Sequence, residues 1–121
     1  MTEPSDSRFD LCSLEELQGR SAMGFLFVHP RFGKHEIGVF WDGDSVFALE
    51  NYCPHEGGML THGFIEPGEV ICPLHAAVFD LRTGECLDKY TTDTTAYEAE
   101  VLDGRVWVTA PGQTRPSTSP P

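Results

Sequence analysis

Two short loops of this chain each combine a cysteine with a histidine. Cys53 and His55 stand two positions apart in the first loop, and Cys72 and His75 stand three positions apart in the second. A proline follows each cysteine and stiffens the backbone there. Two thiolates and two imidazoles make a complete set of four metal ligands. The pattern therefore predicts that the two loops act together at one site.

Three interpretations of this ligand set compete. The four residues could be buried or incidental, because cysteine is often simply buried, but two Cys/His pairs would then stay unexplained. A structural zinc ion takes two sulfur and two nitrogen ligands, yet zinc sites usually pair cysteine with cysteine and histidine with histidine. A [2Fe–2S] cluster with both thiolates on one iron and both imidazoles on the other suits mixed loops. The mixed order favours the cluster.

The loops also carry a family resemblance. The chain contains CPHEGGML at 53–60 and CPLHAAVFDLRTGECL at 72–87, which resemble the Rieske [2Fe–2S] signature in spacing, prolines and trailing sequence. Residues 8–110 resemble the stand-alone Rieske ferredoxins of multicomponent aromatic-ring oxygenases. The resemblance implies one [2Fe–2S] cluster. It also implies its four ligands: Cys53 and Cys72 on the buried iron, and His55 and His75 on the outer iron.

Departures from the pattern of the respiratory Rieske proteins indicate which branch of the family the chain resembles. Rieske proteins of respiratory complexes usually carry an extra cysteine in each loop, where this chain has Gly58 and Leu74. They also place hydroxyl side chains after the second histidine, where this chain has Ala77 and Phe79. These differences indicate the oxygenase branch. Ala76 stands where the family commonly has glycine, so the geometry of the second loop is a point to examine.

The resemblance implies an electron-transfer component and not an enzyme. It would take one electron from a ferredoxin reductase that uses FAD and NAD(P)H, and deliver it to a terminal oxygenase of aromatic hydrocarbon catabolism. An oxygenase would also need a mononuclear iron held by two histidines and a carboxylate. Only His29, His35 and His62 remain, and the chain has no room for a catalytic domain. Two alternatives stay open: a small-subunit-like component of assimilatory nitrite reductase, and a zinc-stabilised binding module.

Composition limits the partners and the location. The 121 residues carry 19 acids against 8 bases, a formal net charge of −11. This charge argues against nucleic acid or an anionic membrane, and favours a partner with a basic face. No apolar run approaches the ~20 residues of a membrane span, and the first residues lack an export signal. We expect a cytoplasmic monomer in which Cys12 and Cys86 are buried and take no part in the site.

The sequence pattern predicts that short strands position the two loops. The fold class expected is all-β, a small antiparallel sandwich or barrel of the Rieske type, with a cluster-binding subdomain made of the two loops within about 51–80. A capping-box signal predicts a helix that begins after Ser13. The remaining pattern predicts a strand at 21–28 and hairpins at 36–51, 69–87 and 96–108, turning at Asp42-Gly43, at the RTG of 82–84 and at Asp103-Gly104.

The expected domain organisation is simple. It consists of a flexible N-terminus at 1–7, one Rieske domain at 8–110, and a disordered Pro/Ser/Thr tail at 111–121 that has nothing to bury.

The last expectation concerns the docking surface. If the two histidines bind the outer iron through one ring nitrogen each, their other edges face the protein surface. An electron needs a short path but only a brief encounter, so an apolar rim in an acidic surround should serve as the contact. The rim expected around the histidines consists of Pro54, Met59, Leu60, Pro73 and Leu74.

Overall fold

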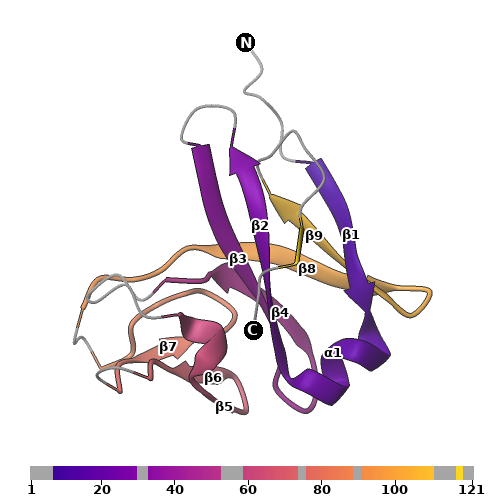
Figure 1. Cartoon of the computed structure of the whole chain (residues 1–121). Coiled ribbons are helices and arrows are strands. Elements are labelled where there is room, and N and C mark those ends of the chain that lie inside the picture. The colour runs from indigo at the N-terminus through magenta and orange to yellow at the C-terminus, as the bar shows by residue number, and fades with distance from the viewer. Residues whose placement is uncertain are drawn as a thin grey trace.

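Two antiparallel sheets make up the fold (Figure 1). The computed structural model describes residues 7–29, 33–52, 59–73, 76–88, 91–110 and 117–118. The larger sheet has seven strands in the order β1-β9-β8-β4-β3-β2-β10 and curls into a nearly closed barrel, and the smaller sheet has the order β5-β6-β7. The all-β fold class is therefore confirmed. The strands of the larger sheet are β1 Ser7–Ser13, β2 Ala22–His29, β3 Gly33–Trp41, β4 Val46–Glu50, β8 Ala96–Leu102, β9 Arg105–Ala110 and β10 Ser117–Thr118.

The helix predicted from the capping box is present. Helix α1 spans Leu14–Arg20, and the side chain of Ser13 accepts a hydrogen bond from the Glu16 N–H at 3.0 Å. Leu17 is fully buried and fixes the helix to the barrel. The cap satisfies one of the free N–H groups of the first turn, which explains why the strand β1 gives way to a helix at this residue.

Two of the three predicted hairpins form as expected. Strands β3 and β4 pair in register around a turn at residues 42–45, and β8 and β9 pair around Asp103-Gly104. Asp103 and Gly104 both have positive φ, 51° and 74°, which is the backbone that a tight two-residue hairpin turn needs. These turns place β3 beside β4 and β8 beside β9, and the pairing of β4 with β8 joins the two hairpins in the barrel.

The third predicted hairpin is corrected by the structure. Strands β6, Glu69–Ile71, and β7, Val78–Asp80, pair directly, so the tip of their hairpin is the second ligand loop and not the RTG segment. The RTG segment forms a further turn, closed by the pairing of Phe79 with Cys86. Gly84 permits this second reversal, because it takes a φ of 80° and donates its N–H to the Asp80 carbonyl at 2.8 Å. The smaller sheet is completed by β5, Phe64–Glu66, which follows the short 3-10 helix η1, Leu60–His62.

Two apolar cores hold the sheets. The first fills the barrel and includes Phe25, Phe27 and Val108. The second lies between the barrel and the smaller sheet: Phe40 and Leu49 of the barrel pack with buried residues of the ligand-loop region. The members contributed by that region are Leu60, Val70, Cys72, Ala77, Phe79, Leu81 and Cys86. The smaller sheet and both loop ends are therefore anchored to the barrel by hydrophobic burial.

Both ends of the chain depart from the expected boundaries. Strand β1 begins at Ser7, one residue inside the segment expected to be flexible. Ser117 and Thr118 form β10, which pairs with Leu26 and Phe25 of β2, so the expectation of a disordered tail is wrong for these two residues. Main-chain hydrogen bonds to an open strand edge need no apolar side chain, and composition alone does not predict them. The rest of 1–6 and 111–121 lies outside the described residues. Within the described ranges, no helix is long and apolar enough to cross a membrane.

Candidate metal centre

The structure describes one of the four predicted ligands. Cys72 follows β6, is 1% exposed and belongs to the second core. Its thiol is free. Cys53, His55 and His75 lie outside the described residues, so the convergence of the four ligands stays a prediction. Among the residues that are described, no group of three or more His, Cys, Asp or Glu side chains forms a metal site.

The backbone around Cys72 makes a tight reversal. The Cys72 N–H donates to the Ala77 carbonyl at 2.8 Å, and the Ala76 N–H donates to the Cys72 carbonyl at 3.0 Å. Ile71 and Val78 pair directly and close the loop at its base. Ala76 has a φ of 61°, the left-handed conformation that glycine adopts most easily. The second loop therefore holds the glycine-like backbone although its residue is alanine.

The first loop is closed at its neck. Tyr52 and Met59, the residues on either side of 53–58, form an antiparallel bridge. One position further out, the Leu60 N–H donates to the Asn51 carbonyl at 3.1 Å. These contacts hold the two ends of the loop at the barrel side of η1. They fix where the segment that carries Cys53 leaves the barrel and where it returns.

Sequence reasoning missed a set of polar residues beneath this neck. Glu36 is 4% exposed and Asn51 is fully buried, and the Asn51 Nδ2 donates to Glu36 Oε2 at 2.8 Å. Burial raises the pKa of Tyr52, and the carboxylates of Glu36 and Glu50 raise it further. The only signal in the sequence was a glutamate inside an otherwise apolar strand, HEIGVF at 35–40.

A second set of polar side chains joins the strands β3, β4 and β8. The Tyr97 hydroxyl donates to Glu50 Oε1 at 2.7 Å, and His35 Nδ1 lies 3.2 Å from the same oxygen. His35 thus belongs to a side-chain network of the barrel. His62, in contrast, is exposed at the end of η1.

The two cysteines outside the ligand set are buried, as predicted. Cys12 is 3% exposed and Cys86 is fully buried, and both thiols are free. Burial, followed by the nearby Glu16, raises the pKa of Cys12 to about 11. The Cys86 thiol donates to Asp88 Oδ1 at 3.2 Å.

The structure contradicts one member of the predicted docking rim, and the docking role of the others stays a prediction. Leu60 is fully buried in the second core and is not a surface residue, because it is the first residue of η1 and packs inward. Met59 is half-buried and Pro73 is exposed, while Pro54 and Leu74 lie outside the described residues. An additional apolar side chain, Phe64 of β5, is 68% exposed. The signal that could have indicated Leu60 is its position after the glycine pair, where the chain turns back to the core.

Two of the four positions that favour the oxygenase branch lie among the described residues. Ala77 and Phe79 are fully buried in the second core. A hydroxyl at either place would have to find a hydrogen-bond partner in an apolar environment. Gly58 and Leu74, the positions of the missing loop cysteines, lie outside the described residues.

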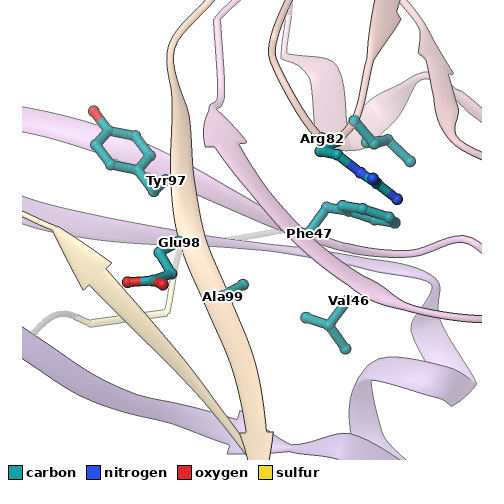
Figure 2. Close-up of a pocket in the computed structure, with 7 residues that line it drawn as sticks. Val46, Phe47, Arg82, Tyr97, Glu98 and Ala99 are labelled. Atoms are coloured by element: carbon teal, nitrogen blue, oxygen red, sulfur yellow. The ribbon is translucent and has the colours of Figure 1, made fainter.

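A shallow depression of about 230 Å³ lies away from the ligand loops. It forms where the turn after β7 meets β4 and β8, and Figure 2 shows Phe47 and Arg82 on one side of β8 and Tyr97 and Glu98 on the other. None of its lining residues is a predicted ligand. The lining residues are Val46, Phe47, Leu81, Arg82, Tyr97, Glu98 and Ala99.

Comparison with known proteins decides the family. The family described as Rieske-like [2Fe-2S] domain matches residues 8–109. The chain belongs to this family. As a member of the Rieske family it carries one Rieske-type [2Fe–2S] cluster, and the zinc interpretation is set aside.

Individual relatives point in the same direction. The ferredoxin subunit of anthranilate 1,2-dioxygenase from Burkholderia cepacia is 38% identical over 78 residues, 63% of this chain and 71% of that protein. The solved ferredoxin of carbazole 1,9a-dioxygenase from Nocardioides aromaticivorans IC177 is 30% identical, covers 87% of this chain and 98% of that one, and superimposes with a TM-score of 0.67. A solved protein from Mycobacterium tuberculosis, assigned as an NADH-dependent nitrite reductase small subunit, is 26% identical over 86% and 95% of the two chains, with a TM-score of 0.69. This Rieske protein is an electron carrier and not itself an enzyme.

The described residues fit the cluster. A cluster thiolate needs a free cysteine shielded from water, and Cys72 is buried, free and placed at the tip of a rigid hairpin. A thiol buried in apolar surroundings is otherwise chemically inert. The neck at Tyr52 and Met59 offers a second loop with fixed ends. Both features agree with the two-loop arrangement that the family implies.

Proposed function

We propose that this Rieske protein is a cytoplasmic ferredoxin that carries one electron from an FAD-dependent NAD(P)H reductase to a terminal Rieske oxygenase of aromatic catabolism. Cys53 and Cys72 hold one iron of its cluster, and His55 and His75 hold the other. The ferredoxin acts as a monomer within one domain at 8–110. The cluster supplies reversible one-electron transfer at a potential raised by histidine ligation.

One observation carries the proposal. Cys72 is buried and free at the tip of a hairpin that the family match includes, and its loop has the Rieske order of cysteine, proline and histidine. The relatives named as ferredoxin subunits of aromatic dioxygenases support the oxygenase system as the destination of the electron. No further chemistry is needed from the chain, because a carrier has only to hold the cluster and to meet its partners.

The protein's own residues perform three tasks in this function. The second core shields the Cys72 side of the site from water, which prevents loss of the thiolate ligand. The paired strands β6 and β7 hold the second loop at a fixed position on the barrel. Exposed residues around the loops, among them Pro73 and Phe64, provide the apolar contact for a partner.

A second candidate is a small subunit of an assimilatory nitrite reductase. It is favoured by the likeness to the Mycobacterium tuberculosis protein, which covers nearly the whole of both chains. The two candidates share the fold and the cluster and differ only in the partner. Reduced protein mixed with a Rieske oxygenase and, separately, with the large subunit of a nitrite reductase should be reoxidised only by the oxygenase. Reoxidation by the large subunit of the nitrite reductase alone would establish the second candidate.

The ligand assignment has a matched test within one core. Cys72 and Cys86 are both buried in the second core, so replacing either by serine buries one hydroxyl in similar surroundings. We expect Cys72→Ser to abolish the cluster, because the iron loses a thiolate, while Cys86→Ser keeps about two irons and two sulfides per chain. Iron and sulfide analysis and the rhombic spectrum of the reduced protein measure the outcome. Equal iron content in both variants would remove Cys72 from the site.

A further inference from the structure

A chain of hydrogen bonds beneath the first ligand loop joins the barrel to the neck of the loop. The Asn51 Nδ2 donates to Glu36 Oε2 at 2.8 Å and to Thr61 Oγ1 at 2.9 Å. The Thr61 N–H donates back to Asn51 Oδ1 at 2.8 Å. The main chain of Asn51 is bound as well, since its N–H donates to the Glu36 carbonyl at 2.9 Å and its carbonyl accepts from the Leu60 N–H. Asn51 is thus tied to β3 on one side and to η1 on the other.

Two glycines leave room for this bridge. Gly24 of β2 and Gly38 of β3 are direct partners in the sheet. A Cβ on Gly24 would collide with Glu36 Oε2 and would lie 3.1 Å from the Asn51 Nδ2. A Cβ on Gly38 would lie 2.7 Å from Cγ2 of Thr61. The two strands therefore accommodate the polar side chains and the start of η1 by omitting side chains of their own.

Filling this buried space with the polar side chains of the bridge has a high cost in free energy. Glu36 is 4% exposed and Asn51 is fully buried, and burying such groups costs free energy unless their hydrogen bonds are made. Apolar side chains of similar volume would fill the space at lower cost. Hydrogen bonds are directional, however, and fix the relative position of two segments more narrowly than apolar packing does. The position of the bridge shows which segments are fixed: β3 and the two ends of the first loop.

We propose that Glu36 is a positioning residue for the first ligand loop. Acting through Asn51 and Thr61, its carboxylate holds the neck in the arrangement in which the loop binds iron. Cys53 follows Asn51 by only two positions, so a shift of Asn51 moves the start of the ligand segment with it. This inference rests on the proposed assignment of Cys53 and His55 as ligands.

The test compares three variants of the cluster-containing protein. Glu36→Met removes the acceptor and leaves the Asn51 Nδ2 with one bond fewer. Glu36→Gln keeps an oxygen that can accept the same bond. Thr61→Val removes Oγ1 but keeps the Thr61 N–H bond to Asn51. We expect excess iron chelator to strip the cluster about tenfold faster from Glu36→Met than from wild type. This rate change corresponds to a decrease of about 1.4 kcal/mol in the activation free energy of cluster loss. Glu36→Gln should stay within about twofold of wild type.

A second measurement separates positioning from general stability. Hydrogen exchange, followed by mass spectrometry, should rise in the peptide that contains residues 51–61 of Glu36→Met and stay unchanged in the peptide over β8 and β9. The matched control is Val108→Ala, which removes buried volume from the first core, whereas Leu60 beside the neck belongs to the second core. It should lower the melting temperature but leave the rate of cluster loss within about twofold of wild type, since a small cavity in the barrel does not free the neck.

The outcomes are distinct. The inference is overturned if Glu36→Met keeps its cluster as long as wild type, if Glu36→Gln loses it as fast as Glu36→Met, or if Val108→Ala loses it equally fast. If Glu36→Met fails to fold, Thr61→Val carries the test, with faster cluster loss and faster exchange at 51–61 expected and wild-type behaviour contradicting it. A wild-type protein that binds no iron at all would instead contradict the proposed function.

Discussion

Ala76 is a residue whose backbone conflicts with its side chain. Its φ of 61° lies in the left-handed region, where a Cβ costs roughly 1 kcal/mol relative to glycine. The Ala76 N–H bond to the Cys72 carbonyl, at 3.0 Å, keeps the residue there. The second ligand loop therefore stores a small strain at the position after the predicted ligand His75.

Ala76→Gly should relieve that strain. We expect the free energy of unfolding to rise by about 0.5–1 kcal/mol, because the gain in the folded state exceeds the added flexibility of the unfolded chain. Denaturant unfolding of the two proteins measures it. The control is Ala99→Gly in β8, where the backbone is an ordinary strand and the same change should destabilise. A loss of stability in both variants would contradict the inferred backbone strain at Ala76.

Cys12 gives a pH dependence with a definite sign. Burial raises its thiol pKa from 9.0 to about 11 in the folded protein. The folded state therefore binds this proton more tightly than the unfolded state does. The resulting stabilisation is fully present below about pH 9 and is lost as the pH rises from there to about 11. At neutral pH the thiol should be protonated and should react slowly with alkylating reagents.

The measurement compares wild type with Cys12→Ala. The free energy of unfolding of wild type should fall more steeply between about pH 9 and pH 11 than that of the variant, because alanine has no proton to lose. Parallel curves would show that the Cys12 thiol has the same pKa in both states.

At the scale of elements, Asp42 connects two turns of different sheets. In the β3–β4 turn, its Oδ1 accepts the N–H groups of Asp44 and Ser45 at 2.9 and 2.8 Å. Its Oδ2 accepts the N–H of Gly68, in the β5–β6 turn, at 2.9 Å. One carboxylate thus closes a barrel hairpin and ties the smaller sheet to it.

Asp42→Asn should break only the tie between the sheets. The asparagine oxygen can replace Oδ1, but its NH₂ group faces the Gly68 N–H and cannot accept its bond. We expect a loss of about 1–2 kcal/mol in the free energy of unfolding at neutral pH. Asp44→Asn, an exposed change in the same turn that leaves the Gly68 bond intact, is the control. Equal effects of both changes would show that the bond to Gly68 contributes nothing.

The same residue sets an acid dependence. Burial acts to raise the pKa of the Asp42 carboxyl, but hydrogen bonds from the N–H groups of residues 45, 44 and 68 outweigh it and hold the pKa below 3.8. Its contribution is present above the unfolded pKa of about 3.8 and is lost as the pH falls through the lower folded value. The stability difference between wild type and Asp42→Asn should therefore shrink below about pH 4.

Among the described residues, four of the five large apolar side chains that are exposed lie at two sites of the molecule, and the fifth is Leu87 after β7. Phe64 and Tyr52 are exposed near the ligand loops, and Val101 with Leu102 is exposed at the end of β8. In Figure 1 the smaller sheet and the β8–β9 turn lie on opposite sides of the molecule. The chain carries a net charge of −11, which favours a partner with a basic face. The first site lies beside the predicted ligand loops, because Phe64 pairs with Ile71 and Tyr52 with Met59, so the proposed ligand assignment gives it the shorter path for an electron.

Electron delivery should therefore depend on the first site. Phe64→Glu should slow transfer to the oxygenase severalfold, because it places a charge in the apolar contact, whereas Leu102→Glu should have little effect. Wild-type transfer should also slow as ionic strength rises, since salt screens the attraction to a basic partner over about 8 Å at physiological ionic strength. Stopped-flow rates measure both effects, and the visible spectrum checks that the cluster is unchanged. If the two variants behaved alike, the electron would have to leave by another face.

The sequence by itself determined the features that neighbouring residues encode. The Cys/His spacing, the helix cap at Ser13 and the Asp103-Gly104 turn each depend on a few consecutive residues, and the cap and the turn are found as predicted. The alternating strands and the burial of Cys86 follow from local pattern and residue type. This local information sufficed for the all-β class and for the family.

Only the tertiary structure decided which distant residues meet. The bridge from Glu36 to Asn51 joins residues 15 positions apart, and the bond from Asp42 to Gly68 spans 26. The burial of Leu60 depends on how η1 packs on the barrel. The sequence shows a glutamate in a strand or an aspartate in a turn, but whether either finds a partner depends on how the two sheets pack. The supports of the ligand loops are long-range contacts, so no local pattern predicted them.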